Sequence, residues 1–276
     1  MVLLEKHLKK FIATDGNPVN YTKIGSTEHN IFGNKYSIPS DKISEFYDAY
    51  KNHVFVNHNP AYITEKQLTN GKIAIDIDFR YKNDVNKKQH TKEHIVDLIE
   101  LIMTGMTSIF TNLKDHPIQF YIFEKEEVNI CKDKTKDGIH IIINIITDFA
   151  TKMILRNYII QNIVDIWDDL PITNTWNDVV DESVMKGHAN WQLYGSKKPG
   201  NEPYKLKYIY NTEIHDNDEI SVNEIDISTI HFDTYFPYFC VRDITNTTEG
   251  ILSKKYQDEY ARINNDFIYK KNKSLK

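Results

Sequence analysis

Two aspartates stand two positions apart in the apolar stretch IAIDIDF at residues 73–79. Because side chains alternate between the faces of a strand, Asp76 and Asp78 are expected on one side and the intervening isoleucines on the other. Adjacent carboxylates repel one another unless a cation lies between them, and hard oxygen ligands suit Mg²⁺ or Mn²⁺. The pair predicts a divalent metal site, although a bare DxD is more often two solvated aspartates. Arg80, at the strand end, either reaches a phosphate or lies in solvent.

A lysine, a glycine and a histidine occupy alternate positions in KDGIH, which runs directly into a β-branched stretch. Lys136, Gly138 and His140 are therefore expected on one face of a strand. Gly138 lets a phosphate approach the backbone, Lys136 supplies a mobile positive charge, and His140 offers a ring N–H to a phosphate oxygen. These residues predict a triphosphate site. The alternative for His140 is a structural histidine at a strand start.

A third group comprises Asp181, in VVDESV, and the basic turn GSKK further along the chain. Asp181 adds a carboxylate that completes a two-metal site. Ser196 and Lys198, or its neighbour Lys197, can bind a γ-phosphate, although the spacing is not that of a P-loop. A capping aspartate and a surface turn are the alternative readings.

Strands and helices alternate around these motifs. The periodicities predict strands at 72–79, 118–123, 138–146, 191–194 and 206–210, and helices at 41–53, 93–110, 152–167 and 252–269. Ser40 is expected to cap the first of these helices, and residues 124–137 to form a loop. Residues 195–203 join two strands as a hairpin or as a longer crossing loop. Residues 176–186 give no clear pattern.

Composition sets outer limits on function. The 276 residues are 40% hydrophobic, enough for one large domain or two joined lobes. The net charge of −5 argues against a uniformly basic nucleic-acid-binding surface, but carboxylates that hold cations are counted in it and lysines cluster locally. Cys131 and Cys240 lie far apart, which predicts neither a disulfide framework nor a zinc module and fits a reducing compartment. With no apolar run of roughly 20 residues, we expect no membrane span or signal peptide.

The three motifs, in this order, resemble the archaeo-eukaryotic primase superfamily, whose members carry a DxD or DxE strand, an SxH or GxH strand, and a later aspartate before a basic Ser-Lys turn. LYGSKKP and the following PYKL are most similar to the N-terminal domains of primase-helicases of large nucleocytoplasmic DNA viruses. The resemblance covers about residues 72–210. It implies Asp76, Asp78 and Asp181 as metal ligands and Lys136, Gly138, His140, Ser196 and Lys198 as nucleotide-binding residues.

The resemblance also implies an activity: template-directed transfer of nucleotides from NTP or dNTP on single-stranded DNA, with Mg²⁺ or Mn²⁺, making primers for viral DNA replication. The implied fold is α/β (α+β), with an RRM-like antiparallel sheet. Its parts are an N-terminal α/β lobe at 1–70, a catalytic core at 71–212 and a C-terminal segment at 213–276. The lysine-rich end at 270–276 would lead to a superfamily 3 helicase domain. The host cytoplasm, a viral factory or the nucleus is the expected location.

One departure from the superfamily pattern concerns arginines. Relatives carry arginines between the third aspartate and the basic turn, where this chain reads KGHANWQ. Ala189 and Gln192 stand at those positions, which leaves His188 or Lys186 as substitutes. This departure favours, as an alternative, a catalytically weak or inactive nucleic-acid-binding scaffold domain. A two-metal nuclease is a second alternative, but a nuclease has no triphosphate to hold.

Overall fold

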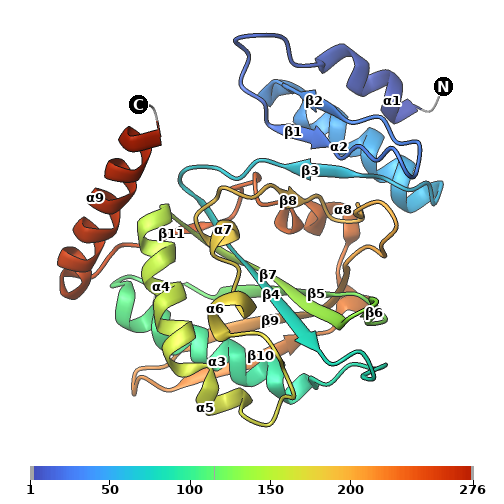
Figure 1. Ribbon diagram of the computed structural model, residues 1–276. Helices are drawn as coiled ribbons and strands as arrows, with labels where there is room; N and C mark the ends of the chain where they lie inside the picture. Colours follow the sequence, from blue (N-terminus) through green and yellow to red (C-terminus); the bar gives the residue numbers. More distant parts are fainter. Residues whose placement is uncertain (1–2, 115, 275–276) are drawn as a thin grey trace.

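A computed structural model describes residues 3–114 and 116–274, which build two sheets (Figure 1). The smaller sheet has the strand order β2-β1-β3-β8, with every pair antiparallel. Its strands are β1 (Tyr21–Lys23), β2 (Asn34–Tyr36), β3 (Ile63–Glu65) and β8 (Trp191–Gln192). Helices α1 (Leu3–Leu8) and α2 (Ile43–Lys51) bury their apolar side chains in the same lobe. Strand β8 thus brings the segment before the basic turn into the N-terminal lobe.

The larger sheet is organised around its longest strand, β7 (Thr135–Thr147). Strand β4 (Gly71–Tyr81) pairs with one edge of β7, and β5 (Ile118–Glu124) with the other, both antiparallel. The sheet continues through β9 (Lys205–Ile214) to β10 (Ile220–Ile225). Two short strands, β6 (Asn129–Ile130) and β11 (Thr248–Glu249), pair with the ends of β7, β11 in parallel.

Two long helices, α3 (Lys92–Ile109) and α4 (Phe149–Asn162), cover one face of the larger sheet (Figure 1). Ile73, Ile75 and Ile77 of β4 are fully buried under these helices. Strict alternation along β4 therefore turns the side chains of Asp76 and Asp78 to the opposite face. This is the arrangement that the sequence predicts.

The opposite face of the sheet is partly covered by the C-terminal segment, with α8 (Phe232–Tyr235) and a 3₁₀ turn (Phe236–Phe239). Lys72 is buried, and its ammonium group donates hydrogen bonds to the carbonyl oxygens of Pro237, Tyr238 and Cys240 at 2.9–3.1 Å. A buried ammonium group without such acceptors would be costly. Lys72 therefore ties this segment to the start of β4.

The predicted strands and long helices are confirmed, with three corrections. Ser40 does not cap a helix, because it begins a 3₁₀ turn and α2 has no side-chain cap. The stretch 152–167 is divided between α4 and α5 (Val164–Trp167). Part of the expected loop 124–137 forms the β6–β7 hairpin. Of the two alternatives for residues 195–203, the crossing loop is confirmed, because β8 belongs to the small sheet and β9 to the large one. The unassigned stretch forms two short helices, α6 (Trp176–Val179) and α7 (Glu182–Met185).

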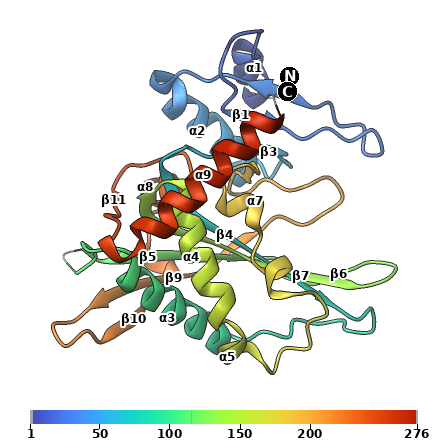
Figure 2. The same ribbon diagram turned by 60° about the vertical axis from the view of Figure 1, so that its left-hand side comes forward.

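The chain closes with α9 (Gln257–Ser274), which contacts α4, and Phe267 packs on Phe149 with ring centroids 4.5 Å apart (Figure 2). None of the described helices is long and apolar enough to cross a membrane. The predicted boundaries at residues 70 and 212 stay predictions, and the second lies within β9. The lysine-rich end at 270–276 extends outside the described residues.

Candidate active site

The DxD and GxH motifs are direct neighbours in the larger sheet. In the register of β4 and β7, Asp76 lies opposite His140 and Asp78 lies opposite Gly138. The Nε2 atom of His140 is 3.5 Å from Oδ1 of Asp76. The two motifs, separated by about sixty residues in the sequence, therefore form one surface.

Asp181 reaches the same surface through the backbone. Val180 pairs with Ile77 as an isolated β-bridge, and the N–H of Asp181 donates to the carbonyl oxygen of Asp76 at 3.0 Å. Oδ1 of Asp181 accepts hydrogen bonds from the N–H groups of Ser183 and Val184 and so caps α7. The capping reading of Asp181 is thus confirmed for Oδ1, and its role as a metal ligand stays a prediction for a residue that stands beside the DxD strand.

A polar cavity of about 320 Å³ opens above these residues. The predicted residues that line it are Asp76, Asp78, Lys136, His140, Asp181 and Lys198. The lining residues that the sequence did not suggest are Lys125, Asn129, Asp137, Asn201, Glu202 and Tyr204, together with Gln192. The β6–β7 hairpin and the loop after β8 project on the same side of the molecule (Figure 2), and Asn129 donates to Asn201 across them at 3.4 Å. The cavity therefore lies between these two loops.

The carboxylates of the cavity repel one another. Burial and, next, the charges of Asp78 and Asp181 raise the pKa of Asp76 to about 7. Burial also raises the pKa of Asp78, against the opposing effects of Arg80 and Lys136. A cation placed between these groups would relieve the repulsion.

The donor set of the cavity fits a hard divalent cation, because it offers carboxylate oxygens and little else on its acidic side. The residues that would hold such an ion are Asp76, Asp78 and Asp181, the last through Oδ2, which the helix cap does not use. Among the described residues, no group of three or more His, Cys, Asp or Glu side chains is already gathered as a metal site. The side chains would have to close around the ion.

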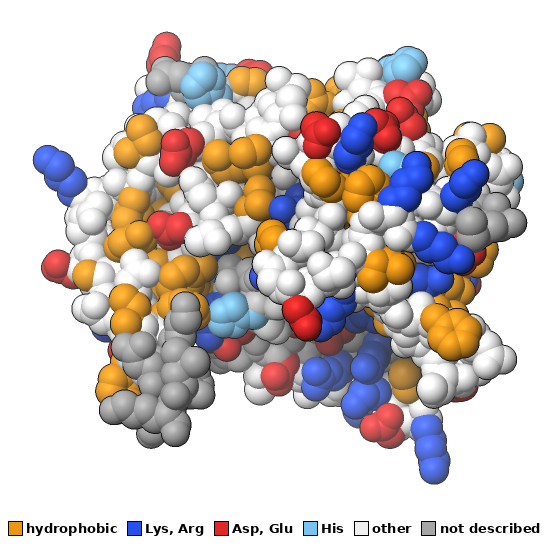
Figure 3. All heavy atoms as spheres, turned by 90° about the horizontal axis from the view of Figure 1, so that it is seen from above, with side chains coloured by type: hydrophobic (Ala, Val, Ile, Leu, Met, Phe, Trp, Pro, Cys, Tyr) orange, Lys and Arg blue, Asp and Glu red, His pale blue; other side chains and the backbone are white. Residues whose placement is uncertain are grey.

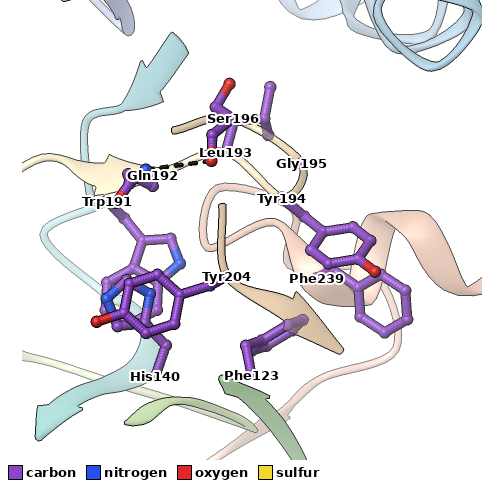
Figure 4. A pocket seen from close by; sticks show the side chains of 10 residues that line it. All are labelled: Phe123, His140, Trp191, Gln192, Leu193, Tyr194, Gly195, Ser196, Tyr204 and Phe239. Carbon is purple, nitrogen blue, oxygen red and sulfur yellow. Dashed lines mark hydrogen bonds between the residues drawn. The ribbon is translucent and has the colours of Figure 1, made fainter. Parts of the chain in front are cut away.

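His140 is enclosed by two aromatic rings (Figure 4). Its ring centroid is 3.6 Å from that of Tyr204 and 4.3 Å from that of Trp191. Burial first, and then the charges of Lys198 and Lys125, lower the pKa of His140 well below its usual value. This burial favours the neutral form of the imidazole.

Residues 26–210, well over half of the chain, match the family described as the C962R protein N-terminal AEP domain. The chain belongs to this family. AEP denotes the archaeo-eukaryotic primases, and domains of this family are part of the primase-helicases of large DNA viruses, as the motifs predicted. The α/β fold expected for an AEP domain is also confirmed. No curated protein matches the chain significantly.

The basic turn of this AEP domain is divided between two environments. Lys198 lines the cavity, whereas the backbone N–H of Lys197 donates to the carbonyl oxygen of Ala61 and its side chain does not line the cavity. Ser196 is buried beside the cavity, where its hydroxyl accepts from the N–H of Ile63 and lies 2.7 Å from the hydroxyl of Tyr50 (Figure 4 shows Ser196). Ser196 therefore holds the turn in place, and Lys198 is the residue of the turn that faces the aspartates.

Gly138 and Arg80, which the sequence predicts to lie near a phosphate, both contact protein groups in the structure. A Cβ atom on Gly138 would lie 2.5 Å from the carbonyl oxygen of Ile77 and 3.0 Å from the hydroxyl of Tyr204. The space left by this glycine is thus used by the neighbouring strand and by Tyr204. Arg80 extends toward Asp78, with Nη2 3.8 Å from Oδ2.

Ala189 and Gln192, at the positions where relatives carry arginines, supply no positive charge to the cavity. Gln192 lines it and donates to the carbonyl oxygen of Ser196 at 3.1 Å. Lys186 forms an ion pair with Glu182 at 2.7 Å, and the ring of His188 lies beside Phe267, so neither substitute lines the cavity.

The positive charge of the cavity comes instead from Lys125, Lys136 and Lys198. Lys125 follows the last residue of β5 in the charged stretch EKEE, where no motif marks it. Only the tertiary fold identifies it as a site residue.

Proposed function

We propose that this AEP domain is a DNA-dependent primase-polymerase, which transfers nucleotides from NTP or dNTP to a growing strand on a single-stranded DNA template. The observation that carries the proposal is the composition of one cavity. Asp76, Asp78 and Asp181 form its acidic side, and Lys125, Lys136 and Lys198 its basic side. Phosphoryl transfer needs this combination, because catalysis consists mostly of positioning and charge stabilisation.

The acidic side would hold Mg²⁺ or Mn²⁺ on Asp76, Asp78 and Asp181. Bound metal ions supply charge neutralisation on the phosphates and lower the pKa of the attacking 3′-hydroxyl. His140 places Nε2 3.5 Å from Oδ1 of Asp76, beside the proposed metal ligands.

The basic side would bind the triphosphate. Lys198 and Lys136 carry positive charge opposite the aspartates, and Lys125 stands near Lys198, whose charge adds to burial in lowering the pKa of Lys125. Two ammonium groups that repel one another are favourable neighbours for an anion with several charges. A triphosphate would relieve this repulsion as a cation would relieve that of the carboxylates.

A second candidate is an AEP domain that binds a template without efficient nucleotide addition. The observation that favours it is the neutral Gln192 at a cavity position where relatives carry an arginine. This reading predicts strand binding that requires neither metal nor nucleotide.

Primer extension and de novo synthesis on single-stranded DNA, with Mg²⁺ or Mn²⁺ and with labelled NTP or dNTP, test the proposal. The wild type should form metal-dependent products, and Asp76→Ala/Asp78→Ala should lower the rate by about 10²-fold or more. Asp84→Ala, at an exposed aspartate after the same strand, is the matched control and should keep full activity. A wild-type protein that binds the template and adds no nucleotide with either metal would establish the scaffold reading instead.

A further inference from the structure

A second groove, of about 660 Å³, lies next to the candidate active site, where β5 ends, β9 begins and α3 starts. Lysines dominate its lining: Lys88, Lys92, Lys125, Lys205 and Lys207. Lys125 lines both this groove and the catalytic cavity. The groove, which we call the lysine groove, therefore adjoins the basic side of the active site at Lys125.

A β-bulge gives the lysine groove its shape. Ile122 pairs with Tyr208 but the next residue of β5, Phe123, pairs with Leu206, so Lys207 is an extra residue in β9. Leu206 packs with Phe123 on the catalytic face of the sheet. Because a bulge redirects side chains, Lys207 joins Lys205 and Tyr208 along the groove on the other side.

Three lysines of the groove, Lys92, Lys205 and Lys207, are available to a ligand, whereas Lys88 is held by the buried carboxylates of Glu124 and Asp137 at 3.2 and 3.3 Å. Lys205 forms an ion pair with Glu126 at 3.0 Å, and Lys92 with Glu224, all four side chains being exposed. Such exposed ion pairs contribute little to stability, so each lysine can readily exchange its carboxylate partner for another anion. Lys207 has no ionic partner among the described residues.

We propose that the lysine groove binds the sugar-phosphate backbone of the single-stranded nucleic acid that enters the catalytic cavity. A row of lysines beside an aromatic ring, here Tyr208, is a common arrangement for binding single strands regardless of sequence. Lys125 would bridge the two sites. On the face drawn in Figure 3, lysine and arginine side chains gather toward the right-hand side, so charge is unevenly distributed over this face. Because local charge matters more than the total, the overall charge of −5 does not oppose binding in a groove lined by five lysines. The inference rests on the proposed function, since the cavity is taken as the place where the strand grows.

Fluorescence anisotropy with a labelled single-stranded oligodeoxynucleotide in EDTA measures this binding without nucleotide addition. Lys205→Ala/Lys207→Ala should weaken binding about tenfold at low salt and reduce the slope of log K against log[salt] by about 1.4, roughly 0.7 for each phosphate contact. Lys205→Arg/Lys207→Arg should bind as the wild type does. The matched control is Lys254→Ala/Lys255→Ala, two exposed lysines near the far end of α3, which should change neither quantity.

Two results would overturn the proposal. One is an alanine double variant that folds normally and binds the strand with wild-type affinity and salt slope. The other is an alanine double variant that loses affinity for free dATP while its affinity for the strand is unchanged, which would make the groove a nucleotide site. A wild type that shows lysine-dependent strand binding but adds no nucleotide would refute the primase-polymerase activity alone and leave the groove assignment standing.

Discussion

The ring of Tyr204 lies flat against the ring of His140, with centroids 3.6 Å apart and planes inclined by 14°. Tyr204 comes from the loop before β9, and its hydroxyl also occupies the space beside Gly138. The GxH motif is therefore covered by the tyrosine of the PYKL stretch, to which the sequence assigned no role in the site. Trp191 also packs on His140, and burial is the main cause of the lowered pKa of His140.

Removing the tyrosine ring should change the protonation of His140. In Tyr204→Ala the imidazole becomes accessible to water, so its pKa should rise toward the usual value of about 6.5. As the pH falls below that value, His140 becomes charged in the variant. The rate of nucleotide addition by the variant should then fall more steeply than that of the wild type. NMR titration of the histidine ring protons and rates measured across this pH range check both effects. Tyr204→Phe keeps the stack and should match the wild type, whereas parallel pH profiles for Tyr204→Ala would contradict the role assigned to the ring.

Strands β4 and β7 lie so close together at Gly138, the glycine of the GxH motif, that no larger residue fits there. Gly138→Ala would place a methyl group 2.5 Å from the carbonyl oxygen of Ile77, so β4 and β7 must separate at the DxD motif. We expect a loss of about 2 kcal/mol in the free energy of unfolding, measured by urea denaturation, as for other overpacked sites.

A second substitution identifies which contact is responsible. Gly138→Ala/Tyr204→Phe should be no more stable than Gly138→Ala, since removing the hydroxyl leaves the clash with the backbone of Ile77 in place. Recovery of stability in the double variant would instead assign the tight contact to Tyr204.

Part of this site follows from local sequence patterns. Alternation along β4 correctly places Asp76 and Asp78 on one face, since the apolar residues between them must be buried. Local pattern does not pair Asp76 with His140, because β7 also pairs with β5 and alternation does not choose among partners. The adjacency of the DxD and GxH strands follows instead from the family resemblance, and the structure confirms it. Lys125 enters the cavity only through tertiary structure.

The crossing after β8 also lay beyond local prediction. A strand of two residues has too little sequence to show which sheet it joins, and β8 joins the small sheet while β9 joins the large one. The crossing loop between them carries Lys198 and Tyr204 into the site. The positions of Lys198 and Tyr204 in the site thus share one cause.

The raised pKa of Asp76 makes the stability of the metal-free protein depend on pH. In the unfolded chain the carboxyl group ionises near its usual pKa of about 4, but in the folded protein near 7, so the folded state binds more protons between these values. Stability should therefore fall as the pH rises through this window.

Asp76→Asn removes the charge and tests this coupling. In EDTA at about pH 8 the variant should be more stable than the wild type by about 2 kcal/mol, less than the roughly 4 kcal/mol of the full shift because 24% of the side chain is exposed. At about pH 4 the wild type and Asp76→Asn should have the same free energy of unfolding. Urea denaturation measures the difference, and Asp41→Asn, at an exposed aspartate, should show none. Equal stabilities of the wild type and Asp76→Asn at both pH values would mean that burial and the neighbouring charges do not destabilise the ionised carboxylate of Asp76.

The two adjacent lysines of the basic turn provide the sharpest test of the site. Lys198 lines the cavity, and its charge opposes the rise in the pKa of Asp76, whereas the side chain of Lys197 does not line the cavity. Lys198→Ala should therefore lower nucleotide addition by about 10²-fold, as the loss of a preorganised charge does at other phosphoryl-transfer sites. Lys197→Ala should stay within about threefold of the wild type, as substitutions outside a site do. Steady-state rates at saturating template separate the two variants. If Lys197→Ala were the more damaging, the turn would have to bind the nucleotide in the reverse orientation, with Lys197 facing the aspartates.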